Sequence, residues 1–188
     1  MKKDITKNLI EEHTLILRML TVLGENAALT AEGKFDNYGF YLEAVRFIRN
    51  YADTFHHAKE EDILFEALVK NGMPRENSPV AAMLLEHDHG RAYVKAMEAA
   101  AQRALAGEAG QNLIIAENAM GYIDLLRDHI DKEDTILYPL AERVIPVGMR
   151  DDILQSYMEA EAKTPTDFGK EYQKLVERYE AAKRAVTV

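Results

Sequence analysis

The chain has 188 residues, with 23 Lys and Arg against 32 Asp and Glu, which gives a formal charge of −9. It contains no basic stretch that could follow a phosphate backbone, no apolar run near the ~18 residues of a membrane span and, at Met1-Lys2-Lys3-Asp4, no apolar signal core. We therefore expect a soluble, cytoplasmic protein that binds neither nucleic acid nor membrane. The chain has no Cys and 6 His, which excludes disulfides, thiolate nucleophiles and iron–sulfur clusters and leaves His and carboxylates as the metal ligands.

Apolar residues recur at three- and four-residue spacing between clusters of Gly and Pro, which is typical of helices. We predict four long helices, at about residues 4–31, 37–69, 79–106 and 111–144. Asp36 is the expected N-cap of the second helix, and Ser78 with Pro79 the expected start of the third. Because the connections are short, these all-α elements should form an up-down-up-down four-helix bundle over residues 1–148.

The pattern changes after Gly148. Asp151 to Ala162 predicts a short amphipathic helix, and about Phe168 to Ala185 predicts another charged helix after a break at Thr164-Pro165. Residues 149–188 are therefore expected to form a C-terminal helical extension. The sequence leaves open whether these helices pack on the bundle, join a homo-oligomer or bind a protein partner.

A repeat relates the second and fourth predicted helices. The segment from His56 to Phe65 matches the segment from His129 to Tyr138 at an offset of 129 − 56 = 73 residues, and each has a Glu four residues after its His. The first and third helices share a Glu-His pair at an offset of 87 − 13 = 74 residues. The chain looks like a duplicated helical hairpin, in which each copy supplies one His and one His-x-x-x-Glu pair.

Residues four apart lie on one face of a helix, so an imidazole and a carboxylate can reach the same ion. A single His-x-x-x-Glu motif on a helix is most often exposed to solvent. Two such motifs in register, together with one His from each of the other two helices, point four imidazoles and two carboxylates into one core. Metal ions would remove the cost of burying the carboxylates, and such ligands suit iron, manganese or zinc. The expected ligands are His13, His56, Glu60, His87, His129 and Glu133.

The alignment also ranks the remaining candidates. It favours His56 over His57 and His87 over His89, because only the favoured residues repeat at the common offset. His57 is expected beside the site or in solvent, and His89 outside the core. Whether His57, Glu61 or His89 joins the site is left open by the sequence.

At these residues the sequence resembles the hemerythrin-like family, also called the HHE cation-binding domain, over about residues 4–144. The motifs that carry the resemblance are His13, His56-His57-x-x-Glu60-Glu61-x-x-Leu64-Phe65, Glu86-His87-x-x-Gly90-Arg91 and His129-x-x-x-Glu133-x-x-x-Leu137-Tyr138-Pro139. The resemblance implies a four-helix bundle that holds two Fe ions, joined by an oxo or hydroxo bridge, with the six residues above as ligands. Zn or Mn would fit the same ligands.

Two departures bear on the function that the resemblance implies. Oxygen-carrying members have His-x-x-x-His on the third helix and His-x-x-x-x-Asp on the fourth, whereas here Arg91 follows His87 by four residues and His129 precedes Glu133 by four. Members associated with the repair of iron centres damaged by nitric oxide or oxidants are more similar to this ligand set.

With about six ligands per iron, four imidazoles, two bridging carboxylates and a bridging oxygen leave roughly two positions for a small molecule. We therefore expect a non-haem di-iron protein that binds, senses or scavenges dioxygen, nitric oxide or peroxide, or that handles iron under oxidative or nitrosative stress. The alternatives are a di-iron oxidoreductase and a metal-regulated helical interaction module. The sequence does not decide whether the protein is an enzyme.

Overall fold

The computed structural model describes the chain from residue 2 to residue 186, with side chains described to residue 182. Over this range the chain is helical and contains no strand, which confirms the predicted all-α class. The elements are α1 (Lys7–Ala31), α2 (Tyr38–Phe47), η1 (Ile48–His57), η2 (Glu60–Leu64), α3 (Phe65–Lys70), α4 (Pro79–Leu105), α5 (Gln111–Lys132), η3 (Glu133–Leu137), α6 (Tyr138–Val144), η4 (Val147–Met149), α7 (Arg150–Glu161) and α8 (Phe168–Val186).

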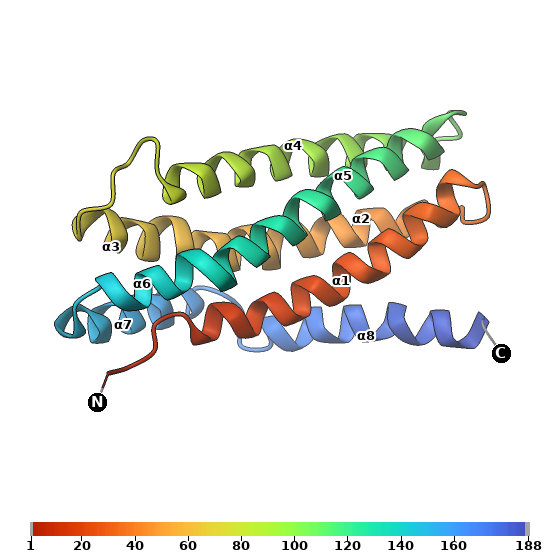
Figure 1. Ribbon diagram of the computed structural model, residues 1–188. Helices are drawn as coiled ribbons and strands as arrows, with labels where there is room; N and C mark the ends of the chain where they lie inside the picture. The colour runs from red at the N-terminus through yellow and green to blue at the C-terminus, as the bar shows by residue number, and fades with distance from the viewer. Residues whose placement is uncertain (1, 187–188) are drawn as a thin grey trace.

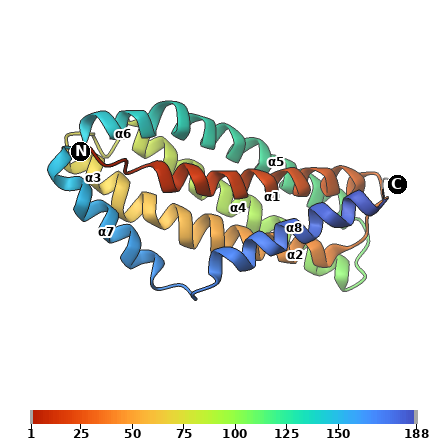
Figure 2. The ribbon, with the colours of Figure 1, turned by 90° about the horizontal axis from the view of Figure 1, so that it is seen from below.

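Four long segments lie side by side, and consecutive segments run in opposite directions along the molecule (Figures 1 and 2). They are α1, the run from α2 to α3, α4, and the run from α5 to α6. The second and fourth segments contain the π-helical stretches η1, η2 and η3. Hydrogen bonds in a π-helix reach five residues along the chain, so each turn is wider than in an α-helix, and such stretches occur often at functional sites.

The helix starts follow the predicted capping chemistry with one exception. Ser78 caps α4 by accepting a hydrogen bond from the backbone N–H of Ala81, and Pro79 occupies the first turn, as predicted. At α2 the cap is Asn37, whose side chain accepts from the backbone N–H of Phe40, so the predicted Asp36 cap is wrong by one residue.

Two apolar clusters divide the core along its length. The larger includes Met19, Leu23, Phe40, Phe47, Met97 and Ile123. The smaller includes Leu9, Leu64, Phe65, Met83, Leu137 and Tyr138. Along α1, Leu9 belongs to the smaller cluster, Ile16 to the larger, and His13 lies between them. The candidate ligands therefore form a polar layer between two apolar ones.

The C-terminal helices pack on the bundle of their own chain, which is the first of the three arrangements that the sequence left open. Ile153 and Tyr157 of α7 join the smaller apolar cluster, and Leu175 and Val176 of α8 join the larger one. Figure 2 shows α8 running beside α1, where Arg18 makes a bidentate ion pair with Glu180. The boundary at residue 148 stays a prediction, since α7 and α8 share both clusters with the bundle.

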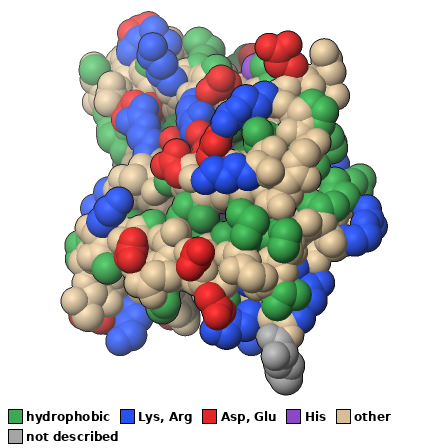
Figure 3. Space-filling view, turned by 90° about the vertical axis from the view of Figure 1, so that its left-hand side faces the viewer, with side chains coloured by type: hydrophobic (Ala, Val, Ile, Leu, Met, Phe, Trp, Pro, Cys, Tyr) green, Lys and Arg blue, Asp and Glu red, His purple; other side chains and the backbone are tan. Residues whose placement is uncertain are grey.

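The surface of the described chain carries charges of both signs. Seen from the end where α3, α6 and α7 lie, acidic and basic side chains are interspersed with apolar ones (Figure 3). One such pair joins Arg75 to Glu66 at 2.7 Å. Between residues 2 and 186, every helix is too short or too polar to cross a membrane.

Candidate metal centre

The six predicted ligands are all buried and form two imidazole pairs. Nε2 of His13 on α1 lies 2.9 Å from Nε2 of His56 on η1. Nε2 of His87 on α4 lies 3.0 Å from Nε2 of His129 on α5. Each hairpin of the repeat therefore brings its own two imidazoles together, with the same ring nitrogens facing inward.

The two glutamates span the two imidazole pairs. Oε2 of Glu60 lies 3.7 Å from Nε2 of His56 and 3.6 Å from Nε2 of His87. Oε2 of Glu133 lies 3.3 Å from Nε2 of both His13 and His129. Since each carboxylate approaches an imidazole of both hairpins, each can bridge two ions, as bundles with dimetal sites require.

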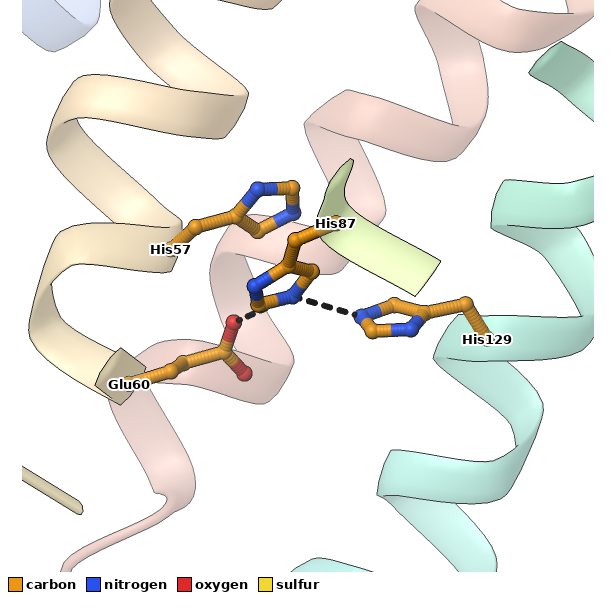
Figure 4. A group of neighbouring side chains, drawn as sticks. All are labelled: His57, Glu60, His87 and His129. Carbon is orange, nitrogen blue, oxygen red and sulfur yellow. Dashed lines mark hydrogen bonds and ion pairs between the residues drawn. The ribbon is translucent and has the colours of Figure 1, made fainter. Parts of the chain in front are cut away.

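Two groups of side chains bring their ligand atoms within 4.8 Å of one another, and Glu60 belongs to both. The first group is His13, His56, Glu60 and Glu133, and the second is His57, Glu60, His87 and His129. Figure 4 shows the second group, in which His57 and Glu60 come from the second long segment and face His87 and His129.

Of the two expected places for His57, beside the site or in solvent, the structure shows the first. It is only 6% exposed, and its ring stacks on His87 with centroids 3.8 Å apart. Its segment, Ile48–His57, is π-helical, so successive residues do not follow the rotation of about 100° per residue of an α-helix. His89 lies on the surface, outside the core.

An outer ring of carboxylates holds the four inward-facing imidazoles. The Nδ1 atoms of His13, His56, His87 and His129 lie 2.7–3.0 Å from Asp134, Glu12, Glu61 and Glu86, respectively. In the neutral form of each imidazole, with Nδ1 donating outward, Nε2 keeps a free electron pair directed inward. Such outer partners fix the tautomer and orientation of metal-ligating histidines.

Two lysines support this ring. Nζ of Lys59 contacts Glu12 and lies 2.8 Å from Glu161 on α7. Lys132 contacts Glu86 in the same way, but it is 39% exposed where Lys59 is 1% exposed. Sequence reasoning missed these outer residues as functional, although the repeat contained the signal: Lys59 and Lys132 have the same 73-residue offset as the ligands.

The duplicated hairpins differ at one aromatic position. The hydroxyl of Tyr138 donates to Oε1 of Glu60, and its ring stacks against His13 with centroids 5.6 Å apart. The equivalent residue of the first hairpin, Phe65, stacks against His87 at 6.1 Å. Oε2 of Glu60 and both oxygens of Glu133 have no hydrogen-bond partner among the described residues. Oε2 of each glutamate faces imidazole nitrogens, and these buried, unpaired oxygens form a donor set for cations.

The pKa shifts of the site residues indicate which of them carry protons when no ion is bound. Burial and the neighbouring Glu133 raise the pKa of Glu60 well above its usual value. Burial acts in the same direction on Glu133, but His129 and His13 outweigh it and hold the pKa of Glu133 well below its usual value. Burial acts to lower the pKa of His13, yet Asp134 and Glu133 raise it to about 9. Without metal, protons on Glu60 and His13 thus provide the charge balance.

His57 has the opposite tendency from His13. Burial and the neighbouring His87 lower its pKa to about 4, although Asp53 opposes the shift. Its imidazole is therefore neutral at neutral pH, the form that binds metal ions.

The model of the family described as hemerythrin HHE cation binding domain matches residues 4–141. The chain belongs to this family. It is also 22% identical over 172 residues to the uncharacterized proteins Mb2018 of Mycobacterium bovis and Rv1995 of Mycobacterium tuberculosis. Each of these matches covers 92% of the chain but 66% of the relative, so the chain spans just under two thirds of those proteins. No solved structure matches the chain.

The residues of this HHE domain fit the cations that the family name implies. Four imidazoles and two bridging carboxylates are a mixed donor set that suits iron, and also zinc or manganese. The buried oxygens of Glu60 and Glu133 that lack hydrogen-bond partners could accept such cations. His13 and His56 would hold one ion, and His87 and His129 the other.

Proposed function

We propose that this chain is a non-haem di-iron protein whose centre binds, senses or scavenges dioxygen, nitric oxide or peroxide, or handles iron under oxidative or nitrosative stress. The observation that carries the proposal is the bridging position of the two glutamates, each within 3.7 Å of an imidazole from both hairpins. We also propose that the protein acts in the cytoplasm, which agrees with the lack of Cys.

The chain's own residues perform three tasks in this proposal. Glu60 and Glu133 would hold the ions together with the imidazoles, and the outer carboxylates keep Nε2 of each imidazole directed inward. The apolar clusters on both sides exclude bulk water from the layer. An iron pair held there supplies redox chemistry and exchangeable positions for a small molecule.

Metal analysis together with absorption spectra tests this proposal. Protein from iron-supplemented cells, purified without added metal, should contain two irons per chain, one for each ligand group. Oxidised protein should show the ultraviolet and near-visible charge-transfer bands of a bridged ferric pair. Reduced protein should change its spectrum on exposure to dioxygen, nitric oxide or peroxide. One iron or none per chain would contradict a di-iron centre.

The structure supports the interaction module less well. Its docking element was expected in the C-terminal helices, but the apolar residues of α8, including Leu175 and Val176, are buried against the same chain. A di-iron oxidoreductase stays compatible with the site. Turnover of the small oxidant, rather than binding alone, would distinguish it.

A further inference from the structure

The two outer lysines of the repeat have different surroundings. In each hairpin a lysine donates to one oxygen of a glutamate whose other oxygen lies against Nδ1 of a ligand histidine: Lys59, Glu12 and His56 in the first, and Lys132, Glu86 and His129 in the second. Lys59 also donates to Glu161 of α7, at 2.8 Å. Among the described residues, the C-terminal extension thus adds a carboxylate to the outer ring of the first hairpin alone.

The burial of Lys59 explains why it has a second carboxylate. Its side chain is 1% exposed, whereas that of Lys132 is 39% exposed. A buried ammonium group is costly unless it is paired, while an exposed one is stabilised by water. Glu161 and the ring of Phe55, whose centroid lies 4.0 Å from Nζ of Lys59, surround the ammonium in place of water.

The place of Glu161 in α7 is not explained by the stability of that helix. Glu161 is the last residue of α7, and the last turn contains no basic residue. A negative charge at the C-terminal end of a helix is disfavoured by the helix dipole. The contact with Lys59 compensates for this position, so the carboxylate of Glu161 serves the outer ring rather than its own helix.

The remainder of α7 is anchored to the bundle. At its start, the buried Arg150 donates to the carboxylate of Glu142 at 2.5 Å and to the backbone carbonyl of Lys3 at 2.6 Å. Along its length, Ile153 and Tyr157 pack in the smaller apolar cluster. Figure 2 shows α7 beside the segment that runs from α2 to α3, where it contacts η2. The helix is therefore held from its start to the point where Glu161 reaches the outer ring.

A series of contacts connects this end of α7 to a ligand histidine. Lys59 donates to Glu161 and to Oε1 of Glu12. Oε2 of Glu12 lies 2.7 Å from Nδ1 of His56, whose Nε2 faces His13. Because Lys59 and His56 hold one oxygen each, the orientation of the Glu12 carboxylate depends on where Lys59 lies. Outer partners of this kind change the metal affinity of the histidines that they orient.

We propose that Glu161 is a positioning residue of the metal centre, which acts through Lys59 and Glu12 on His56, so that the docking of α7 and the binding of one ion stabilise each other. Such coupling is reciprocal, because each equilibrium shifts the other by the same factor. The inference rests on the proposed di-iron function and gives the C-terminal extension a role in it. The ion at His87 and His129 should not respond to α7.

The first test removes the charge of Glu161 and keeps its size. In Glu161→Gln, Lys59 retains Glu12 as a partner, so the variant should fold. Competition with a chelator of known affinity should show that one of the two irons is bound about tenfold more weakly, at the lower end of the range for outer partners of metal ligands. The matched control is Glu159→Gln, which removes a charge from an exposed position of the same helix, where Glu159 accepts from Gln155. It should bind both irons with wild-type affinity.

The second test asks whether Glu161 acts through Lys59. Lys59→Met interrupts the series of contacts in its middle. Adding Glu161→Gln to Lys59→Met should therefore not weaken iron binding further, because residues that act along one path have non-additive effects. Additive losses of affinity would mean that Glu161 does not act through Lys59, and would overturn the proposed path.

The third test measures the reverse direction of the coupling by hydrogen exchange. Iron should slow the exchange of backbone amides in α7 more than in α8, which packs on the larger apolar cluster away from the ligands. In Glu161→Gln this difference between α7 and α8 should disappear. A purely structural contact between Glu161 and Lys59 would stabilise α7 equally with and without iron.

The outcomes separate this inference from the function on which it rests. If wild-type protein binds two irons and Glu161→Gln binds both with wild-type affinity, the coupling is wrong and the di-iron function stands. The same conclusion follows if iron slows exchange equally in α7 and α8 of the wild-type protein. If the wild-type protein binds one iron or none, the di-iron function and the coupling are both wrong.

Discussion

Tyr138 donates its hydroxyl to Glu60 across the two hairpins, and nothing equivalent is offered to Glu133 because the matching residue is Phe65. The repeat therefore builds a nearly symmetric layer with one asymmetric hydrogen bond at a bridging carboxylate. Since a phenyl ring already fills the matching place in the first hairpin, the hydroxyl of Tyr138 can be removed with little change in packing.

Tyr138→Phe should destabilise the metal-free protein more than the metal-loaded protein. Without metal, the substitution leaves Oε1 of Glu60 buried and unpaired, at a cost of about 1–3 kcal/mol. Bound ions would supply an alternative partner. Urea unfolding with and without iron measures the difference. Tyr41→Phe, which breaks the buried bond to Thr30 away from the site, should cost the same in both forms. Equal losses for Tyr138→Phe would contradict a metal partner for Glu60.

Substitution of the histidines should separate the inner ligands from the rest. His56→Ala and His87→Ala should lower the iron content, because each removes one imidazole from a pair. His89→Ala should leave the iron content unchanged, since His89 is exposed. Because His57 belongs to the second ligand group, His57→Ala should speed the loss of one iron to a chelator. Release of iron at the wild-type rate would mean that His57 is not a ligand, as the repeat alone suggests.

Loss of an outer carboxylate should weaken metal binding nearly as much as loss of a ligand. Glu12→Gln removes the charged partner of both His56 and Lys59. Loss of such a partner costs about 10–100-fold in metal affinity, measurable by competition with a chelator of known affinity. Glu98→Gln, which breaks only the surface pair with Arg49, is the matched control. Wild-type affinity in Glu12→Gln would show that the outer ring does not tune the site.

Much of the fold and of the candidate site could be predicted because both depend on local periodicity and on the repeat. The shared offset selected His56, Glu60, His129 and Glu133, all of which are buried in the two ligand groups. The burial of His57 against His87 could not be predicted in this way, because a change from α- to π-helix leaves no periodic trace in the sequence. The contact between Lys59 and Glu161 joins residues 102 positions apart, and no local pattern reports it.

Metal binding should release protons from the core at neutral pH. The pKa of about 9 for His13 in the folded protein lies above the usual histidine value of 6.5. Its contribution to the stability of the metal-free protein is therefore fully present below pH 6.5 and is lost as the pH rises through about 9. The pKa of Glu60 is also raised, so its contribution to stability likewise falls as the pH rises. A metal ion needs neutral imidazole and ionised carboxylate, so it must displace these protons.

Three measurements follow from this competition. Calorimetric titration with ferrous iron, in buffers that differ in ionisation enthalpy, should show protons released per metal bound. Asp134→Asn keeps every inner ligand but removes a carboxylate that raises the pKa of His13, so it should release fewer protons than the wild type. Metal should raise the Tm, because a ligand that binds only the native state stabilises it by mass action. This gain should shrink as the pH falls below the imidazole range, because protons then compete with the metal for the histidines. Equal Tm values with metal and with chelator at neutral pH would mean that His13 and Glu60 do not hold ions in the core.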